Sequence, residues 1–112
     1  MAIIVTTSEP TALLSSMKST LISTEQHSWY CDNDGDFTMR MSAVAAWFRP
    51  RIEGDTIVFR IITARGQTMK RGTYALYHGK FIEMLLRNFD TRFSRVVASA
   101  LASHGDVIEP SK

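Results

Sequence analysis

Two stretches rich in apolar residues, separated by Gly54-Asp55, occupy residues 47–62, and this segment limits the possible folds more than any other part of the chain. A glycine at the first position of a two-residue loop is typical of a type II′ turn, which joins antiparallel strands. With this loop, the cross-strand pairs are 52/57, 50/59 and 48/61 on one face and 51/58, 49/60 and 47/62 on the other. The sequence therefore predicts a β-hairpin with a defined register.

The two faces of this hairpin differ in chemistry. One is wholly apolar and consists of Phe48, Pro50, Ile52, Ile57, Phe59 and Ile61. The other carries Trp47, Arg49, Arg51, Val58, Arg60 and Ile62. Arg49 and Arg60 are predicted to face each other directly, which destabilises a sheet unless an acidic group lies over them. The identity of that acidic group would largely decide the function.

Length and composition are those of one ordinary globular domain. The chain has 112 residues, of which 45% are hydrophobic and 21% charged, and a chain of this size needs no metal or disulfide to fold. We expect a single domain over residues 1–102 and a frayed tail over residues 103–112, because that stretch is polar and ends in Pro110-Ser111-Lys112.

Charge is distributed unevenly along the chain. Residues 1–36 carry one lysine against five acidic residues, a net charge of −4, whereas residues 37–102 carry eleven basic against four acidic residues, a net charge of +7. Such asymmetry fits either a basic surface for an anionic partner or neutralisation of one part of the chain by the other. We favour neutralisation within the chain.

The sequence favours a cytoplasmic location. Cys31 is the only cysteine, so no intramolecular disulfide can form. The first residues do not have the pattern of a signal peptide, and no apolar run approaches the length that spans a bilayer. We therefore expect no membrane partner.

Local patterns predict two helices and several strands. We expect strands at 2–6, 27–31, 37–39 and 46–63 (the hairpin), a turn at 32–36, and helices at 9–23 and 69–89 with Ser8 and Thr68 as their N-caps. In the second helix the apolar stripe is predicted to include Leu76, and Gly72 and Gly79 are expected to allow close packing on the sheet. Residues 93–101 fit a helix or a strand, and we favour a strand.

These elements predict an α+β domain, with one mostly antiparallel sheet and two helices packed on one face. The opposite sheet face, with Trp47, Arg49, Arg51 and Arg60, is expected to be partly open.

The acidic segment Asp32-Asn33-Asp34-Gly35-Asp36 has four possible roles. Its alternating carboxylates are of the type that binds hard cations, but its glycine is fourth rather than sixth and its twelfth residue is Ala43, so the EF-hand pattern fails. We predict a hairpin turn and no metal site. Asp32, Asp34 and Asp36 could instead neutralise Arg49 and Arg60, or take part in binding a partner.

Catalytic signatures are weak. His78 follows Tyr74 by four residues, and His27 and Cys31 lie on one face of a predicted strand, but no third orienting residue is evident. The chain contains none of the common nucleotide-binding, zinc-protease, hydrolase or CxxC motifs. We expect no cofactor.

Three functional classes follow, in order of preference. The first is a small non-catalytic protein-binding module of regulatory, adaptor or toxin-neutralising type, which uses the Arg/Trp-rich sheet face or the acidic turn. The second is a nucleic-acid-binding module that uses the same arginines. The third is a small enzyme with an irregular site around His78 or Cys31. A homodimer is compatible with an uncovered sheet face.

Overall fold

The computed structural model describes residues 2–21, 28–40, 46–64, 69–99 and 108–109. It contains one six-stranded antiparallel sheet with the strand order β2-β3-β4-β5-β1-β7. In chain order, the elements are β1 (Ala2–Thr6), α1 (Pro10–Thr20), β2 (Trp29–Cys31), β3 (Phe37–Met39), β4 (Ala46–Glu53), β5 (Thr56–Thr63), β6 (Met69–Lys70), α2 (Arg71–Phe89), β7 (Arg95–Ala98) and β8 (Ile108–Glu109). Strands β6 and β8 form a separate parallel pair.

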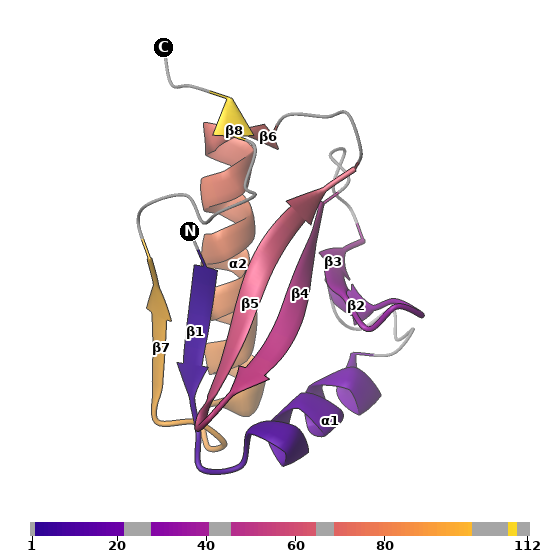
Figure 1. The fold of residues 1–112 in the computed structure, drawn as a ribbon. Helices are drawn as coiled ribbons and strands as arrows, with labels where there is room; N and C mark the ends of the chain where they lie inside the picture. Colours follow the sequence, from indigo (N-terminus) through magenta and orange to yellow (C-terminus); the bar gives the residue numbers. More distant parts are fainter. Residues whose placement is uncertain (1, 22–27, 41–45, 65–68, 100–107, 110–112) are drawn as a thin grey trace.

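The predicted α+β class is confirmed, with both helices on one side of the sheet. In Figure 1, α2 runs behind β1 and β5, and α1 lies beside the turn end of the β4–β5 hairpin. Buried residues of both helices join the inward residues of the sheet in one hydrophobic cluster, which includes Leu13, Met17, Phe37, Phe59 and Phe81. The core therefore lies entirely between the helices and this sheet face.

The hairpin forms in the predicted register. All six predicted pairs are observed, among them Phe48 with Ile61 and Arg49 with Arg60. Gly54 has φ +62°, the positive value that the first position of the predicted turn requires. The apolar face points to the core, although Ile52, near the turn, remains 39% exposed.

The remaining strands extend the sheet on both sides of the hairpin. Strand β1 lies between β5 and β7, so the predicted final strand is confirmed over Arg95–Ala98. On the other side, β2 and β3 form a second hairpin, joined to the first by the pairing of Phe37 with Phe48. Predictions for residues 100–101 lie outside the described residues.

Aromatic packing holds α2 on the sheet. The Phe81 ring lies 4.6 Å from that of Phe48, 4.8 Å from that of Phe59 and 5.0 Å from that of Trp29, measured between centroids. These spacings are typical of favourable aromatic contacts. Together with its contact to Phe37 of β3 at 6.0 Å, Phe81 thereby links α2 to β2, β3, β4 and β5.

Several predicted helix ends are wrong. Glu9 rather than Ser8 occupies the N-cap position of α1, and the hydroxyl of Thr7 accepts a hydrogen bond from the Glu9 N–H while donating one to the Arg92 carbonyl. Helix α1 ends at Thr20, and the predicted end at Ser23 lies outside the described residues. Lys70, rather than Thr68, occupies the N-cap position of α2. Helix α2 begins at Arg71 because the two residues before it pair with β8.

The C-terminal stretch, expected to fray, contains this paired strand. Ile108 lies opposite Met69, and Glu109 lies opposite Lys70, in the parallel β6–β8 ladder. Residues 103–107 and 110–112 lie outside the described residues. The chain from 108 to 109 thus meets the start of α2 (Figure 1).

The prediction that Leu76, Gly72 and Gly79 lie on the buried side of α2 is also wrong. Leu76 is 53% exposed rather than part of the buried stripe. Gly72 and Gly79 are exposed too, and a Cβ at either position would meet nothing within 4 Å. The glycines therefore do not allow close packing on the sheet, and the buried side of α2 is formed by Tyr74, Tyr77, His78, Phe81, Met84, Leu85 and Phe89.

We expect Gly72→Ala and Gly79→Ala each to raise the free energy of unfolding by about 0.5–1 kcal/mol, because alanine favours the helix and meets no steric barrier. Urea unfolding of dilute protein measures this. Gly35→Ala is the contrasting variant, because Gly35 has φ +83° and its Cβ would lie 3.3 Å from Lys18 Nζ. That variant should lose about 1 kcal/mol or more. Destabilisation by both helix substitutions would contradict this account of α2.

Candidate functional site

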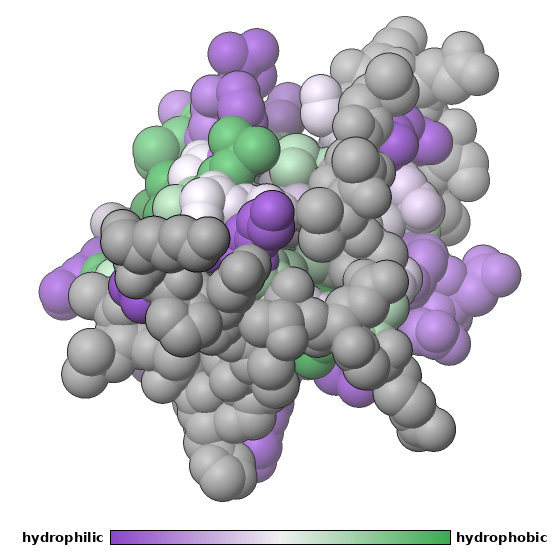
Figure 2. Space-filling model, turned by 90° about the horizontal axis from the view of Figure 1, so that it is seen from above, coloured by the Kyte–Doolittle hydropathy of each residue, from purple (hydrophilic) through white to green (hydrophobic). Residues whose placement is uncertain are grey.

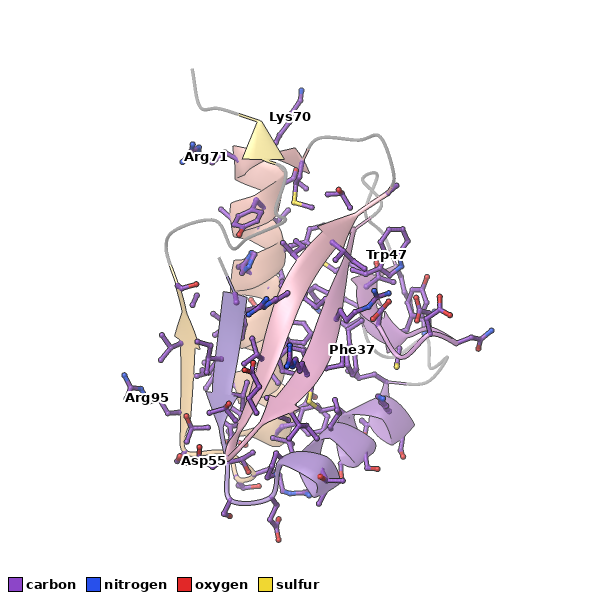
Figure 3. All side chains as sticks on the ribbon, in the orientation of Figure 1. Phe37, Trp47, Asp55, Lys70, Arg71 and Arg95 are labelled. Carbon is purple, nitrogen blue, oxygen red and sulfur yellow. The ribbon has the colours of Figure 1, made fainter. Side chains whose placement is uncertain are left out.

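No helix of the described residues lies over the second face of the six-stranded sheet, which we call the open face. Because side chains alternate along each strand, this face receives the residues between the core positions. Its exposed members include Arg49, Arg51, Glu53, Arg60, Arg95 and Val97, and its half-buried members include Ile4, Trp47 and Ile62. Figure 3 shows Trp47 on β4 toward the β2–β3 side and Arg95 at the opposite edge.

Strand pairing arranges these side chains in rows across the sheet. One row runs from Arg49 to its cross-strand neighbour Arg60 and on to Ala2. The next row contains Arg51, Val58, Ile4 and Val97. Val97 is 36% exposed, and Ile4 is half-buried. Val58, Ile4 and Val97 therefore form an apolar row that has Arg51 at its end and lies directly beside Arg49 and Arg60.

Asp36 neutralises one of the two opposed arginines. Arg49 Nε and Nη2 donate to the two carboxylate oxygens of Asp36 at 3.1 and 2.8 Å, a bidentate pair. Asp36 is only 3% exposed, whereas the Arg49 side chain is 60% exposed. The hydrogen bonds and charge of Asp36 raise the pKa of Arg49. Neutralisation within the chain, which the charge distribution favours, therefore occurs at Arg49.

The acidic segment is a hairpin turn, as predicted, and Asp32 organises it. Asp32 Oδ1 accepts hydrogen bonds from the backbone N–H groups of Asp34 and Asp36 at 2.9 and 3.0 Å. Gly35 adopts φ +83° and donates its N–H to the Asp32 carbonyl. The turn joins β2 to β3, and it thereby delivers Asp36 beside Arg49.

The three carboxylates of this turn are close enough to share a cation. One oxygen each from Asp32, Asp34 and Asp36 lies within 4.8 Å of the others. However, both oxygens of Asp36 already hold Arg49, and Asp32 Oδ1 already accepts two N–H groups. These contacts account for the cluster as a turn and an ion pair.

Arg51 and Arg60 differ from Arg49. Both are exposed, and within the described part of the chain neither side chain makes a hydrogen bond or an ion pair. Asp32 and Asp34, which could also have covered the arginines, bond with neither of them. Trp47 is half-buried in β4. The structure thus brings Arg49 and Asp36 together and leaves two arginines of the predicted site accessible.

Sequence reasoning missed the parts of the open face outside the hairpin. Ile4 joins it because β1 pairs with β5, and Arg95 and Val97 join it because β7 pairs with β1. The alternation of side chains along residues 2–6 and 95–98 shows which residues of each strand share a face. It does not show which strands are neighbours in the sheet.

The two candidate catalytic residues are buried or half-buried. His78 is buried beside the rings of Phe48 and Tyr74, and its Nδ1 lies 2.7 Å from the Tyr74 carbonyl oxygen. Cys31 is half-buried, and burial raises its pKa above the ordinary value of 9.0. A nucleophilic cysteine requires a lowered pKa. His27 lies outside the described residues.

Comparison with models of protein families, with curated proteins and with solved structures found no match. Among the described residues, neither helix combines the length and the apolar character that crossing a bilayer requires.

A double-mutant cycle tests the Asp36–Arg49 pair. Because Arg49 is largely solvated, we expect a coupling free energy of about 0.5–1 kcal/mol between Asp36→Ala and Arg49→Ala in urea unfolding. Asp36→Ala also leaves Arg49 opposite Arg60, so adding Arg60→Ala should recover part of the loss. Asp34→Ala is the matched control and should change little. Zero coupling would mean that the ion pair has no role in holding the turn.

The thiol of Cys31 should react slowly. Burial raises the pKa of Cys31 above 9.0. We therefore measure the rate of iodoacetamide alkylation from about pH 7 to pH 10, in folded and in urea-unfolded protein. The increase of this rate with pH should begin at a higher pH in the folded protein. The unfolded thiol ionises first, so the free energy of unfolding should fall as the pH rises above 9.0. Faster alkylation of the folded than of the unfolded protein would contradict this expectation and would favour a reactive role for Cys31.

Proposed function

We propose that the chain is a non-catalytic protein-binding module whose open face binds an acidic, partly apolar surface of another protein. The observation that carries this proposal is the placement of two accessible arginines, Arg51 and Arg60, beside the apolar row of Ile4, Val58 and Val97. A cytoplasmic regulatory, adaptor or toxin-neutralising protein would use such a face.

The charge of the open face sets the kind of partner. Arg49 is already neutralised by Asp36, whereas Arg51, Arg60 and Arg95 have no ion-pair partner among the described residues. Glu53, near the turn of the hairpin, is an acidic residue on the same face, next to Arg51 along β4. The face is therefore basic, and complementary potentials favour an acidic partner. Arginine and tryptophan are also the residues that most often dominate binding energy at protein interfaces.

Nucleic acid is the alternative, and the aromatic residues give it less support. Binding of single strands combines arginines with open aromatic rings on which bases stack. On the open face the Arg40 guanidinium lies 4.8 Å from the centroid of the Tyr30 ring and covers it. Trp47 is half-buried. An apolar row matches a protein surface better than a phosphate backbone.

Titration of ¹⁵N-labelled protein with two probes tests this proposal. The probes are a peptide that mixes Asp and Glu with Leu and Val, and a single-stranded oligonucleotide, both at low salt. We expect the peptide to shift amide signals of β1, β4 and β5, and Arg51→Glu with Arg60→Glu to weaken that binding at least about tenfold. Lys70→Glu, at the end of the molecule labelled in Figure 3, is the charge-matched control and should retain binding.

Two outcomes would count against the proposal. Saturable binding of the oligonucleotide, with a strong salt dependence and no response to the peptide, would favour the nucleic-acid alternative. No shift of open-face signals with either probe would contradict a binding role for this face.

A further inference from the structure

The outer side of α2 exposes two large apolar side chains. Leu76 and Leu86 are 53% and 51% exposed, more than any other large hydrophobic residue described. Between and beside them, Gly72 and Gly79 present bare backbone with open space above it. Figure 2, seen from above, shows hydrophobic surface next to hydrophilic side chains at its upper left, toward the side that lies behind the sheet in Figure 1.

The spacing of these residues follows a regular repeat. Gly72, Leu76, Gly79, Glu83 and Leu86 are separated alternately by four and three positions. This is the repeat with which two helices pack along their length, and it keeps one stripe facing the partner. The opposite side of α2 already packs on the sheet, so the stripe has no partner within the described chain.

We propose that this stripe is the interface of a symmetric homodimer in which α2 of two copies packs antiparallel. With the two-fold axis at the level of residue 81, Leu76 of one copy meets Leu86 of the second copy. Gly79 then lies opposite Glu83 of the second copy. Each contact occurs twice, as two-fold symmetry requires, and four half-exposed leucines become buried.

The charges of α2 complement a second copy of itself. Glu83 lies 3.7 Å from Lys80 and 3.9 Å from Arg87 within one chain, in long, exposed ion pairs. In the antiparallel arrangement Glu83 comes level with Lys80 of the second copy, and Gly79 leaves room for its side chain. Asp90, just after the helix, comes level with the helix start of the second copy, where the macrodipole is positive. This self-complementarity favours a second copy over an unrelated apolar partner.

The size of the contact indicates a weak, reversible dimer. A helix of 19 residues is about 28 Å long, and a single helix pair is small for a protein interface. Because α2 and the open face lie on opposite sides of the sheet (Figure 1), the dimer would present two open faces pointing outward. The dimer does not depend on what the open face binds.

Sedimentation velocity of the full chain, from about 10 µM to about 1 mM, tests the dimer. We expect a reversible monomer–dimer equilibrium in this range. Leu76→Glu with Leu86→Glu should weaken it at least about tenfold, because both substitutions place charge in the interface. Ile52→Glu, which changes a 39% exposed residue on the hairpin instead, is the matched control and should leave it unchanged.

Gly79→Leu separates loss of the interface from loss of the fold. In the monomer the new side chain meets open space and replaces a poor helix former, so helical circular dichroism and stability should be retained. In the dimer it would fill the space expected for Glu83 of the second copy, so association should weaken. A monomer at every concentration, or a dimer that survives both the leucine substitutions and Gly79→Leu, would overturn the proposal.

Discussion

Phe81 packs against both strands of the central hairpin, 4.6 Å from Phe48 and 4.8 Å from Phe59, and the rest of the structure depends on this contact. It fixes which face of β4 and β5 is buried. Since side chains alternate strictly along a strand, burial of the phenylalanines forces Arg49 and Arg60 onto the opposite face. The basic character of the open face is therefore a direct consequence of core packing, because a shift by one residue would expose the aromatic rings.

The fold resolves the resulting repulsion only in part. The β2–β3 turn supplies Asp36, and its bidentate contact neutralises Arg49, while no described acidic group pairs with Arg51 or Arg60. Neutralisation within the chain and a basic binding surface thus occur together, at neighbouring residues of the same face. This combination underlies the proposal that the face binds an acidic protein surface.

The sequence predicts those parts of the fold and site that depend on local pattern. The hairpin register follows from Gly54 and strict alternation. The counted charges indicate that Asp32, Asp34 and Asp36 could neutralise Arg49 and Arg60, but they do not say which carboxylate meets which arginine. Local pattern does not give the start of α2, because the pairing of Met69 with Ile108 is a contact between distant residues. It does not give the exposure of Leu76 either, because α2 carries apolar residues on both sides and the sequence alone does not say which side meets the sheet. Ile4 and Val97 required the strand order, which local pattern does not contain.

The central claim is that Arg51 and Arg60 are accessible on the open face while Arg49 is held by Asp36. Arginine-specific labelling with a dicarbonyl reagent, followed by mass spectrometry over a time course, measures this directly for each side chain. We predict rapid modification of Arg51 and Arg60 and slower modification of Arg49, with Asp36→Ala removing the difference. Protection of Arg60 equal to that of Arg49, or labelling of Arg49 as fast as Arg51, would contradict the account.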